Sequence, residues 1–423
     1  MEGRKPDATG ARNAAHLRRA NLERVLTEAM ARPGSFTRAE LIDATGLSAP
    51  TVGSITRELI RRGVVRDLGT GPARVGRRPS FMEFSSRYGF VAGIDLGPTT
   101  SRVAVADLRG DLLGRRELQT PHLGPAALLL KIVASLRELL TELRVHESRL
   151  LAVVVGAPGA VDRDRGMVVQ LAPNLKGWSR VPVGEMLAQS LATPVFVEND
   201  VNLAIVGEHR RGAARGHETC AYITVGTGIG AGILVDGELH RGHHSLAGEI
   251  ALMCVGPQYV DRDFGASGCL ESLAGLRALA RRWSGSSTAP PELEARHILE
   301  AAAAGDRRAR RLLREVATLL GIAATNLSVV LDPSLIVFGG VISQNQAFIE
   351  EIRRIVARII PSPPLIVPSA LGKEATLWGC LLLATTQARG LLRDGLRDDR
   401  TARKRTGGRN GASTNRPDRS AAQ

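Results

Sequence analysis

The residue best placed for chemistry in this sequence is Asp200, which stands between an apolar, strand-like run and a helix-like run. A carboxylate at the end of a strand that faces a phosphate-binding cleft can remove the proton of an attacking hydroxyl group. An aspartate at a strand–helix junction can also be an N-cap that accepts hydrogen bonds from free backbone N–H groups. The sequence leaves both roles open for Asp200, a general base or a helix cap.

Two loops of small and polar residues could hold phosphate groups. Residues 95–100 interrupt two apolar strand patterns within residues 88–107, and residues 226–232 (GTGIGAG) do the same within residues 220–236. Glycine lets the backbone come close to a ligand, so that N–H groups of such a loop can surround a phosphate. Because the strand–loop–strand pattern occurs twice, we expect two related lobes that face a cleft.

Charge is concentrated at the two ends of the 423-residue chain. Residues 1–90 contain 16 Lys and Arg against 9 Asp and Glu, and residues 389–423 contain 10 against 4. The middle, residues 91–388, is nearly neutral with 30 against 29. A basic N-terminal domain suits a polyanion, whereas the middle needs none. The C-terminal segment has no recurring apolar positions after Leu396, which predicts a solvated, disordered tail.

Three helices are expected in the basic N-terminal domain. The first has apolar residues at near-helical spacing and ends before Pro33-Gly34. Thr37 and Glu40 form a capping box that opens a short second helix, which Gly46 ends. Two helices joined by a tight, glycine-containing turn make a helix-turn-helix. The predicted apolar stripes are Leu17, Leu22, Val25, Leu26 and Met30 in the first helix, and Val52, Ile55, Leu59 and Ile60 in the third.

The third helix and the segment after it carry the residues expected to contact DNA. The outer face of this helix has small or hydrogen-bonding side chains and one cation, which suits a major groove. After Gly63, two strand patterns separated by a Gly-rich stretch predict a hairpin wing whose arginines can reach phosphates. The alternative is a small helical domain with ordinary surface arginines. The predicted DNA-binding residues are Ser48, which can also cap the helix, Pro50, Thr51, Ser54 and Arg57, with Arg77 and Arg78 in the wing.

Several protein classes are disfavoured. We expect no membrane span because the chain lacks a run of about eighteen apolar residues. We expect no secretory signal because the N-terminus has no apolar segment. The four cysteines are scattered without a CxxC spacing, which is typical of a reducing compartment. These observations together predict a cytoplasmic protein.

Over about residues 17–388 the chain resembles the ROK family of repressors, open reading frames and sugar kinases. The resemblance is to the transcriptional-regulator branch, which has an N-terminal winged helix-turn-helix. It implies an α/β, actin-like and hexokinase-type two-lobed ATPase fold, preceded by an α+β winged helix-turn-helix. The expected boundaries are residues 1–86, 87–388 and 389–423. The motifs that carry the resemblance are Asp95-Leu96-Gly97-x-Thr99, Gly156-Ala157-Pro158-Gly159, Glu198-Asn199-Asp200-Val201-Asn202, Gly226-Thr227-Gly228-x-Gly230, Gly248-Glu249-Ile250, Gly268-Cys269-Leu270-Glu271 and Gly339-Gly340.

The resemblance also implies roles for individual residues. Asp200 would be the catalytic base of a kinase. The sugar-binding residues would be Gly159, Asn199, Asp200, Glu249 and Glu271. The phosphate- and ATP-binding residues would be Asp95, Gly97, Thr99, Gly226, Thr227, Gly228, Gly230, Gly339 and Gly340.

The chain departs from the family pattern at two places. Pro98 stands where the first phosphate loop has a second glycine, and proline removes an N–H donor and fixes φ. The family's four zinc ligands correspond to Leu252, Arg262, Phe264 and Cys269, of which three cannot bind zinc. We therefore expect no metal site. Cys254 is interpreted as a small core residue.

Two functions from different classes remain. The first is a sugar-responsive DNA-binding transcriptional regulator, a repressor of carbohydrate uptake or catabolism genes. The second is an ATP-dependent, glucokinase-like sugar kinase with Asp200 as general base. The expected partners are a double-stranded DNA operator, a sugar or sugar-phosphate effector and further copies of the chain in a dimer or tetramer, with no membrane. No cofactor is required, zinc is not expected, and Mg-ATP stays open as a ligand.

Overall fold

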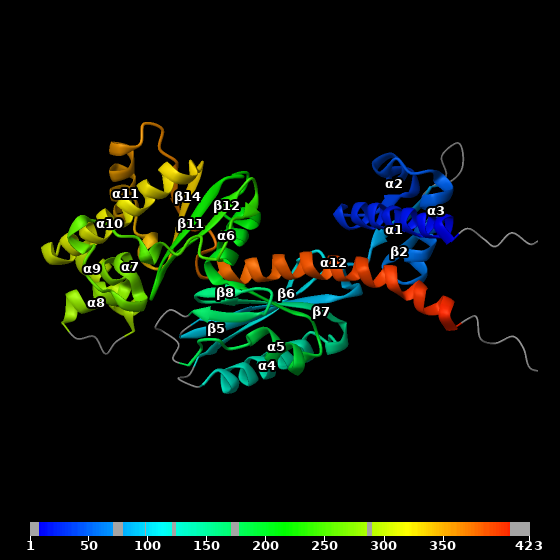
Figure 1. Cartoon of the computed structure of the whole chain (residues 1–423), viewed down its shortest axis with the longest axis horizontal. Coiled ribbons are helices and arrows are strands. Elements are labelled where there is room, and N and C mark those ends of the chain that lie inside the picture. The colour runs from blue at the N-terminus through cyan, green and yellow to red at the C-terminus, as the bar shows by residue number, and fades with distance from the viewer. Residues whose placement is uncertain are drawn as a thin grey trace, which may run out of the picture. The chain divides into compact units, whose positions relative to one another are not determined.

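The computed structural model describes residues 8–70, 79–97, 99–120, 124–170, 177–285 and 290–406 (Figure 1). The chain forms two compact units. We call Met1–Tyr88 together with Gln387–Gln423 the small unit, and Gly89–Thr386 the large unit. The first division lies two residues after the boundary expected from the sequence. The second places part of the C-terminal segment with the N-terminal domain.

The small unit contains three helices and a three-stranded sheet in the order β1-β3-β2. The predicted capping box is confirmed, because Glu40 N donates to Thr37 Oγ1 and Thr37 N donates to a Glu40 carboxylate oxygen. Gly46 ends the second helix in the left-handed conformation. The elements are α1 (Ala8–Ala31), β1 (Phe36–Thr37), α2 (Arg38–Thr45), α3 (Ala49–Arg61), β2 (Val65–Thr70) and β3 (Ser80–Phe84), followed by the short η1 (Ser86–Tyr88).

Most residues of the apolar stripes predicted for α1 and α3 form the core of this unit, but Ile60 is only half-buried and Leu17 is exposed. Val25 and Leu26 of α1 and Leu59 of α3 are fully buried, whereas Leu17 is 63% exposed, so its assignment to the core was wrong. β2 and β3 pair antiparallel, as a wing requires. The segment that joins them, with Arg77 and Arg78, lies outside the described residues.

The C-terminal helix α12 (Ala375–Thr406) begins in the large unit and ends in the small unit. Residues 389–406 are therefore helical, and the prediction of a disordered tail from residue 389 was wrong for them. Within the small unit Leu392 is buried, and Arg393 Nη1 lies 2.9 Å from Glu23 Oε1 of α1. The ion pair joins the helix to α1, whereas the sequence pattern showed only the high charge of this segment.

The large unit contains two five-stranded sheets with the same topology. Their strand orders are β10-β7-β4-β5-β6 and β15-β14-β11-β12-β13. In each, three successive antiparallel strands are followed by two parallel strands on the other side of the first. The predicted pair of related lobes is thus confirmed. The strands are β4 (Phe90–Asp95), β5 (Thr100–Asp107), β6 (Leu112–Gln119), β7 (Leu150–Ala157) and β10 (Val195–Asn199) in the first sheet, and β11 (Cys220–Val225), β12 (Ile229–Val235), β13 (Glu238–Leu239), β14 (Leu335–Gly339) and β15 (Leu365–Pro368) in the second.

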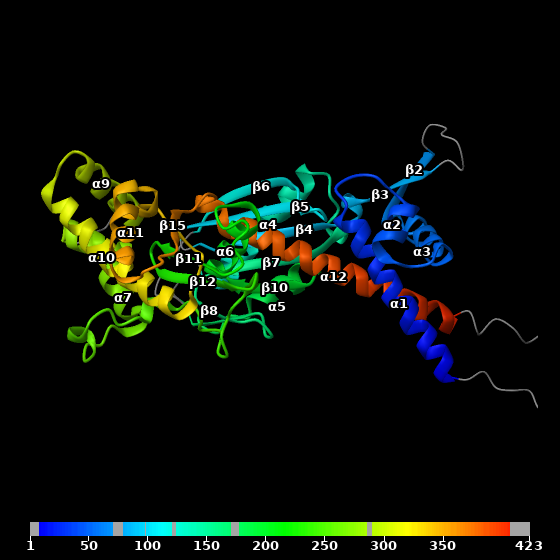
Figure 2. The same ribbon diagram turned by 90° about the horizontal axis from the view of Figure 1, so that it is seen from above.

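Helices cover both faces of the first sheet. α4 (Pro125–Glu142) and α5 (Val183–Leu191) lie on one face, and α12 lies on the other (Figure 1). α6 (Asp200–Arg211) follows β10 directly and is close to α12 in both views (Figures 1 and 2). A small hairpin of β8 (Ala160–Asp162) and β9 (Met167–Gln170) follows β7.

The second lobe packs five helices with its sheet into one apolar core. α10 (Arg307–Leu331) is, within the described ranges, the one helix long and apolar enough to cross a membrane, but 56% of its apolar stretch is buried. Its fully buried Leu320 and Ala324 belong to this core. The helices are α7 (Gly268–Ala274), α8 (Leu276–Ser284), α9 (Pro291–Ala303), α10 (Arg307–Leu331) and α11 (Gln346–Ile359), with short 3-10 turns at η2 (Glu147–Arg149), η3 (Ile250–Leu252), η4 (Pro257–Tyr259), η5 (Gly265–Ser267), η6 (Ile342–Gln344) and η7 (Gly372–Glu374).

Candidate functional site

A pocket in the large unit collects every residue that the sequence assigned to sugar binding. Its walls come from the turn after β7, the β10–α6 junction, the β11–β12 loop, the segment before η3 and the start of α7. The lining includes Gly159, Asn199, Asp200, Glu249 and Glu271, together with Gly226, Thr227, Gly228 and Gly230 of the second loop. Asp95, Gly97, Thr99, Gly339 and Gly340 are not part of the lining.

The cap of α6 is Asn199 and not Asp200. The Asn199 side-chain oxygen accepts hydrogen bonds from the backbone N–H groups of Val201 at 2.9 Å and Asn202 at 3.0 Å. Its Nδ2 donates to the carbonyl of Gly159 at 3.0 Å, which fixes the turn after β7 against the helix start. The interpretation of Asp200 as the helix cap was therefore wrong, because Asn199 makes the capping hydrogen bonds.

The carboxyl group of Asp200 is held in a site that disfavours its charge. Burial raises its pKa to about 7, and the carboxylates of Asp95 and Glu249 add to that rise. A hydrogen bond from the backbone N–H of Val201, 2.9 Å from Asp200 Oδ1, acts in the opposite direction. A carboxyl group that titrates near neutral pH can accept or release a proton at a sugar hydroxyl.

Two further carboxyl groups face the same pocket. Burial raises the pKa of Glu249 and also that of Glu271. Glu271 Oε2 accepts a hydrogen bond of 2.8 Å from the backbone N–H of Ile229, which joins α7 to the glycine loop. Carboxylates that accept hydrogen bonds are suited to the many hydroxyl donors of a sugar.

One buried carboxylate ties three walls of the pocket together, and the sequence interpretation gave it no role. Glu198, the last residue before Asn199, is 2% exposed. Its carboxylate accepts from Arg241 Nε at 2.8 Å and lies 3.3 Å from Arg163 Nε. It also accepts from the side chain of Asn202 at 3.1 Å. We call Glu198, Arg163 and Arg241 the clasp.

The clasp joins segments that are distant in sequence. Arg163 follows β8, whose first residue lines the pocket, and Arg241 precedes the pocket-lining residues 245–249. Glu198 is the first residue of the Glu198–Asn202 motif. An acidic residue at the end of an apolar strand was the signal that could have indicated a role for it. Nothing local indicated which arginines would pair with it.

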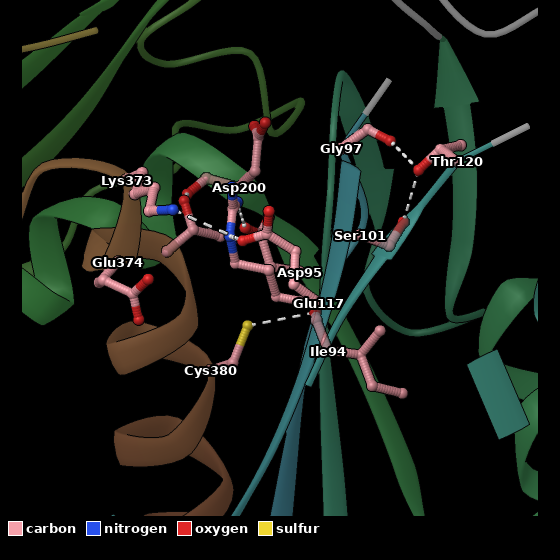
Figure 3. A network of polar contacts seen from close by, with 12 residues as sticks. Ile94, Asp95, Gly97, Ser101, Glu117, Thr120, Asp200, Lys373, Glu374 and Cys380 are labelled. Atoms are coloured by element: carbon pink, nitrogen blue, oxygen red, sulfur yellow. Dashed lines mark hydrogen bonds and ion pairs between the residues drawn. The ribbon is translucent and has the colours of Figure 1, made fainter. Parts of the chain in front are cut away.

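The loop predicted to bind the first phosphate follows β4, and Figure 3 shows the polar groups around Asp95 at its start. Asp95, at the end of β4, is 7% exposed, and Arg102 Nη1 of the neighbouring strand β5 lies 3.0 Å from its Oδ2. Burial raises the pKa of Asp95 to about 6, although Arg102 favours the ionised form. Arg102 Nε donates to Glu117 at 3.0 Å, and Lys373 Nζ lies 3.6 Å from the same carboxylate. The sequence interpretation missed Arg102.

The loop itself is fastened to the end of β6. Thr120 donates its hydroxyl to the carbonyl of Gly97 at 2.9 Å, and its backbone N–H donates to the carbonyl of Thr99 at 2.8 Å. Ser101 Oγ and Thr120 Oγ1 are 3.0 Å apart (Figure 3). Pro98 lies outside the described residues, so its effect on phosphate binding stays a prediction.

The two glycines at the end of β14, Gly339 and Gly340, have a structural explanation. A Cβ on Gly339 would come within 1.8 Å of the hydroxyl of Tyr222, and one on Gly340 within 2.0 Å of the carbonyl of Val225. Gly340 also has a φ of +93°, which other residues rarely adopt. Their assignment to an adenine site remains an expectation.

The segment expected to have lost zinc ligands is held by aromatic packing. The ring of Phe264 lies 6.0 Å from that of Tyr259, edge to face, and the guanidinium of Arg262 lies 5.3 Å from the Phe264 ring. Cys269 is buried in the core of the second lobe, whereas Cys254 is exposed, so its interpretation as a core residue was wrong. In the part of the chain that is described, no cluster of three or more His, Cys, Asp or Glu could hold a metal.

The predicted DNA-contacting face of α3 is available. Pro50 and Arg57 are exposed, and Thr51 and Ser54 are partly exposed. Ser48 occupies the N-cap position, but its hydroxyl pairs with Thr51 Oγ1 at 2.9 Å and not with the backbone, so its capping role was wrong. The opposite face is buried at Val52 and Ile55.

The ROK family profile matches residues 91–387. The chain belongs to the ROK family. It is 28% identical over 338 residues to the xylose repressor of Caldicellulosiruptor bescii, which covers 76% of this chain and 83% of that protein. It is 32% identical over 318 residues to the glucokinase of Streptomyces coelicolor, which covers 70% of this chain and 98% of that protein.

A solved structure extends the similarity to the small unit. A ROK family transcriptional regulator, described as a homologue of the E. coli MLC protein, matches with a TM-score of 0.71 and 23% identity. The match covers 90% of this chain and 100% of that chain, more than the 70% spanned by the glucokinase. The expected two-lobed kinase-like fold with an additional N-terminal part is thereby confirmed.

Proposed function

We propose that this protein is a transcriptional repressor of carbohydrate genes whose ROK domain senses a sugar. The observation that carries the proposal is the contrast between the two halves of the site. The sugar-binding carboxylates all line one pocket, whereas Asp95 of the first phosphate loop is buried against Arg102. The small unit supplies a helix-turn-helix with an open outer face on α3. The names of the xylose repressors and of the solved regulator support the same function.

The pocket favours a neutral sugar over a sugar phosphate. Its lining includes the carboxyl groups of Asp200, Glu249 and Glu271, and none of the described lining residues is Lys, Arg or His. A phosphate would bring negative charge next to three carboxyl groups without a cation to balance it. Hydroxyl groups, by contrast, can donate to all three. The sugar of the effector is thus expected to enter without a phosphate.

The residues present do not fit Mg-ATP well. In a kinase of this family Asp95 would assist the metal-bound phosphate, but here its carboxylate is paired with Arg102 and largely shielded from solvent. Zinc fits no better, because Leu252, Arg262 and Phe264 offer no ligand atoms that zinc uses. Neither group is part of the proposed mechanism.

A sugar kinase is the second candidate, and one observation favours it. Asp200 lies in the pocket next to the Gly226–Gly230 loop, and its pKa of about 7 suits a general base. The similarity to glucokinases covers the same part of the chain. A hydroxyl activated by Asp200 would still need a phosphoryl donor held at the first loop. There the Asp95 carboxylate is already paired with Arg102.

The proposed partners follow from this function. The basic small unit binds double-stranded DNA, and the pocket binds the sugar. Proteins of the helix-turn-helix class usually read two half-sites as dimers, so we expect a homodimer or a homotetramer. A repressor acts where the DNA is, which places it in the cytoplasm.

A thermal-shift screen tests this function. The full-length protein is heated with D-xylose, D-glucose and their phosphates, each with and without Mg-ATP. The proposal predicts stabilisation by at least one neutral sugar, no stabilisation by its phosphate and no added effect of Mg-ATP. Stabilisation that requires Mg-ATP, with release of ADP, would instead favour the kinase.

A further inference from the structure

The start of α12 contacts the backbone at Asp200, which lines the pocket, and next to Asp95, which does not. Thr376 Oγ1 donates a hydrogen bond of 3.2 Å to the carbonyl of Asp200. One turn further along, Cys380 Sγ lies 3.3 Å from the carbonyl of Ile94, the residue before Asp95 (Figure 3). Residues four apart share one face of a helix. A single face of α12 therefore contacts the backbone near the ends of both β4 and β10.

The crossing of α6 and α12 is a backbone-to-backbone contact. A Cβ on Gly379 of α12 would come within 1.9 Å of the carbonyl oxygen of Leu203, and one on Gly207 of α6 within 2.3 Å of the carbonyl oxygen of Ala375. No side chain stands between the helices there to absorb a displacement by changing rotamer. Because interiors are close-packed, a shift of α6 must move α12.

The other end of α6 is tied to the loop that leads into α12. Glu208, in the last turn of α6, is fully buried. Its carboxylate accepts hydrogen bonds from the hydroxyl of Ser369 and from the backbone N–H groups of Leu371 at 3.0 Å and Ala213 at 2.7 Å. Ser369 and Leu371 lie between β15 and α12. The two helices are therefore joined at both ends of α6.

α6 begins in the sugar pocket, and α12 continues into the small unit. Asp200, Val201 and Asn202 of α6 line the pocket. Beyond Thr386 the same α12 belongs to the small unit, where Arg393 pairs with Glu23 of α1. α12 therefore has residues in both units: Thr376 contacts Asp200 within the large unit, and Arg393 pairs with Glu23 within the small unit.

We infer that the α6–α12 crossing is the joint through which sugar occupancy changes the affinity for DNA. This inference rests on the proposed function. A ligand that rearranges the helix start at Asp200 acts on α12 through Thr376 and through the contact at Gly379. Coupling of this kind is a free energy shared by two sites, so it is measured as the ratio of DNA affinities with and without sugar.

The test uses two variants of the joint and two controls on the same helix. Thr376→Val removes the hydrogen-bond donor at nearly constant volume, and Gly379→Ala introduces the Cβ that meets Leu203. Thr386→Val is the first control, because its exposed hydroxyl bonds only to its own helix at Leu382. Gly390→Ala is the second, because a Cβ at Gly390 meets nothing within 4 Å.

Each protein is assayed for binding to a duplex enriched by the wild type from a random-sequence library, with and without saturating D-xylose or D-glucose. The sugar affinity is measured separately by calorimetry. We expect Thr376→Val to bind both ligands nearly as the wild type does, while the ratio of DNA affinities falls by about three- to tenfold. Gly379→Ala should lose the ratio more completely, and both controls should retain it.

One outcome would contradict the α6–α12 joint alone, and another would contradict the proposed function. If Thr376→Val and Gly379→Ala keep the wild-type ratio while the wild type responds to sugar, the joint is wrong and the proposed function stands. If the wild type enriches no duplex, or if neither sugar alters its binding, the proposed function fails and the joint falls with it. Because Thr376→Val is conservative, the test survives even if Gly379→Ala does not fold.

Discussion

Arg102 Nη1 lies 3.0 Å from Asp95 Oδ2, across two neighbouring strands of the first sheet. The pair gives Asp95 a permanent counter-ion at the loop where a sugar kinase of this fold handles phosphate. Breaking a buried ion pair leaves an unpaired charge, which costs more than the pair itself contributes. Loss of Arg102 would therefore leave the Asp95 carboxylate buried without a cation at the end of β4.

A double-mutant cycle measures this pair. Arg102→Ala should destabilise the protein by about 2–3 kcal/mol, because Asp95 stays buried without its cation. Adding Asp95→Asn should recover part of that loss. Arg115→Ala, which removes an exposed arginine paired with Glu374, serves as control and should cost less than about 1 kcal/mol. Urea unfolding gives each value, and strictly additive effects of the two changes would contradict an energetic coupling.

The pKa of Asp200 predicts a pH dependence of stability. Its folded-state pKa of about 7 is above the ordinary value of 3.8, so the folded protein holds this proton more tightly than the unfolded chain. The stabilisation is present at low pH and is lost as pH rises between about 4 and 7. Asp200→Asn should therefore gain about 1–2 kcal/mol over the wild type between pH 5 and pH 8, allowing for partial exposure.

Urea unfolding at pH 5, 6, 7 and 8 checks the sign. Asp164→Asn, at an exposed position in the β8–β9 turn, is the matched carboxylate control. Its stability should follow the wild type at every pH. A difference between Asp200→Asn and the wild type that stays constant, or that shrinks as pH rises, would show that the carboxyl group is not held as the structure indicates.

The clasp predicts a loss of sugar affinity without a change in any pocket-lining side chain. Glu198→Gln should weaken sugar binding by about tenfold, since both arginines lose a charged partner and the segments that carry them loosen. Arg241→Ala should act in the same direction. Arg165→Ala changes a more exposed arginine of the same hairpin, which pairs with Asp162 at 3.7 Å, and should leave the affinity unchanged. Calorimetry with D-xylose and D-glucose decides, and equal affinities for Glu198→Gln and Arg165→Ala would rule the clasp out.

DNA binding by the small unit should depend strongly on salt. If Arg57, Arg77 and Arg78 each contact a phosphate, replacing any one by Ala should reduce the slope of log affinity against log salt by about 1. Thr51→Ala or Ser54→Ala should instead alter the preferred sequence. Arg358→Ala, in α11 of the large unit, is the control. Anisotropy titrations at several salt concentrations suffice, and identical slopes for all four arginine variants would contradict the assigned surface.

Local signals in the sequence predicted the local structure well. The capping box of Thr37 and Glu40 needs only residues three apart, and Gly46 marks the tight turn that makes the helix-turn-helix. The repeated strand–loop–strand pattern predicted two lobes because both copies use the same strand periodicity. The sugar-binding residues came from the family resemblance, and the pocket brings all five together.

Long-range pairing was not predictable in this way. Glu198 and Arg241 are 43 residues apart, and no local pattern indicates that two loops will meet at one carboxylate. Arg102 occupies a strand position where a charged side chain usually faces solvent, and its partner depends on strand register. Charge density alone suggested disorder for residues 389–406, because the ion pair of Arg393 with Glu23 depends on a helix 370 residues earlier. At the α6 start, the sequence offered Asp200 as the cap, whereas the side chain of Asn199 makes the capping hydrogen bonds.

The measurement that tests the central claim most directly is the affinity of the full-length wild type for its enriched duplex with and without a neutral sugar, in the absence of ATP. We predict a loss of affinity of tenfold or more, equivalent to about 1.4 kcal/mol of coupling, which one or two hydrogen bonds present in only one state can supply. Asp200→Asn should bind the duplex normally but respond weakly to the sugar, and neither protein should form sugar phosphate when ATP is added. Robust sugar-dependent ADP release that is abolished by Asp200→Asn, with no effect of sugar on DNA binding, would contradict the account and establish the protein as a kinase.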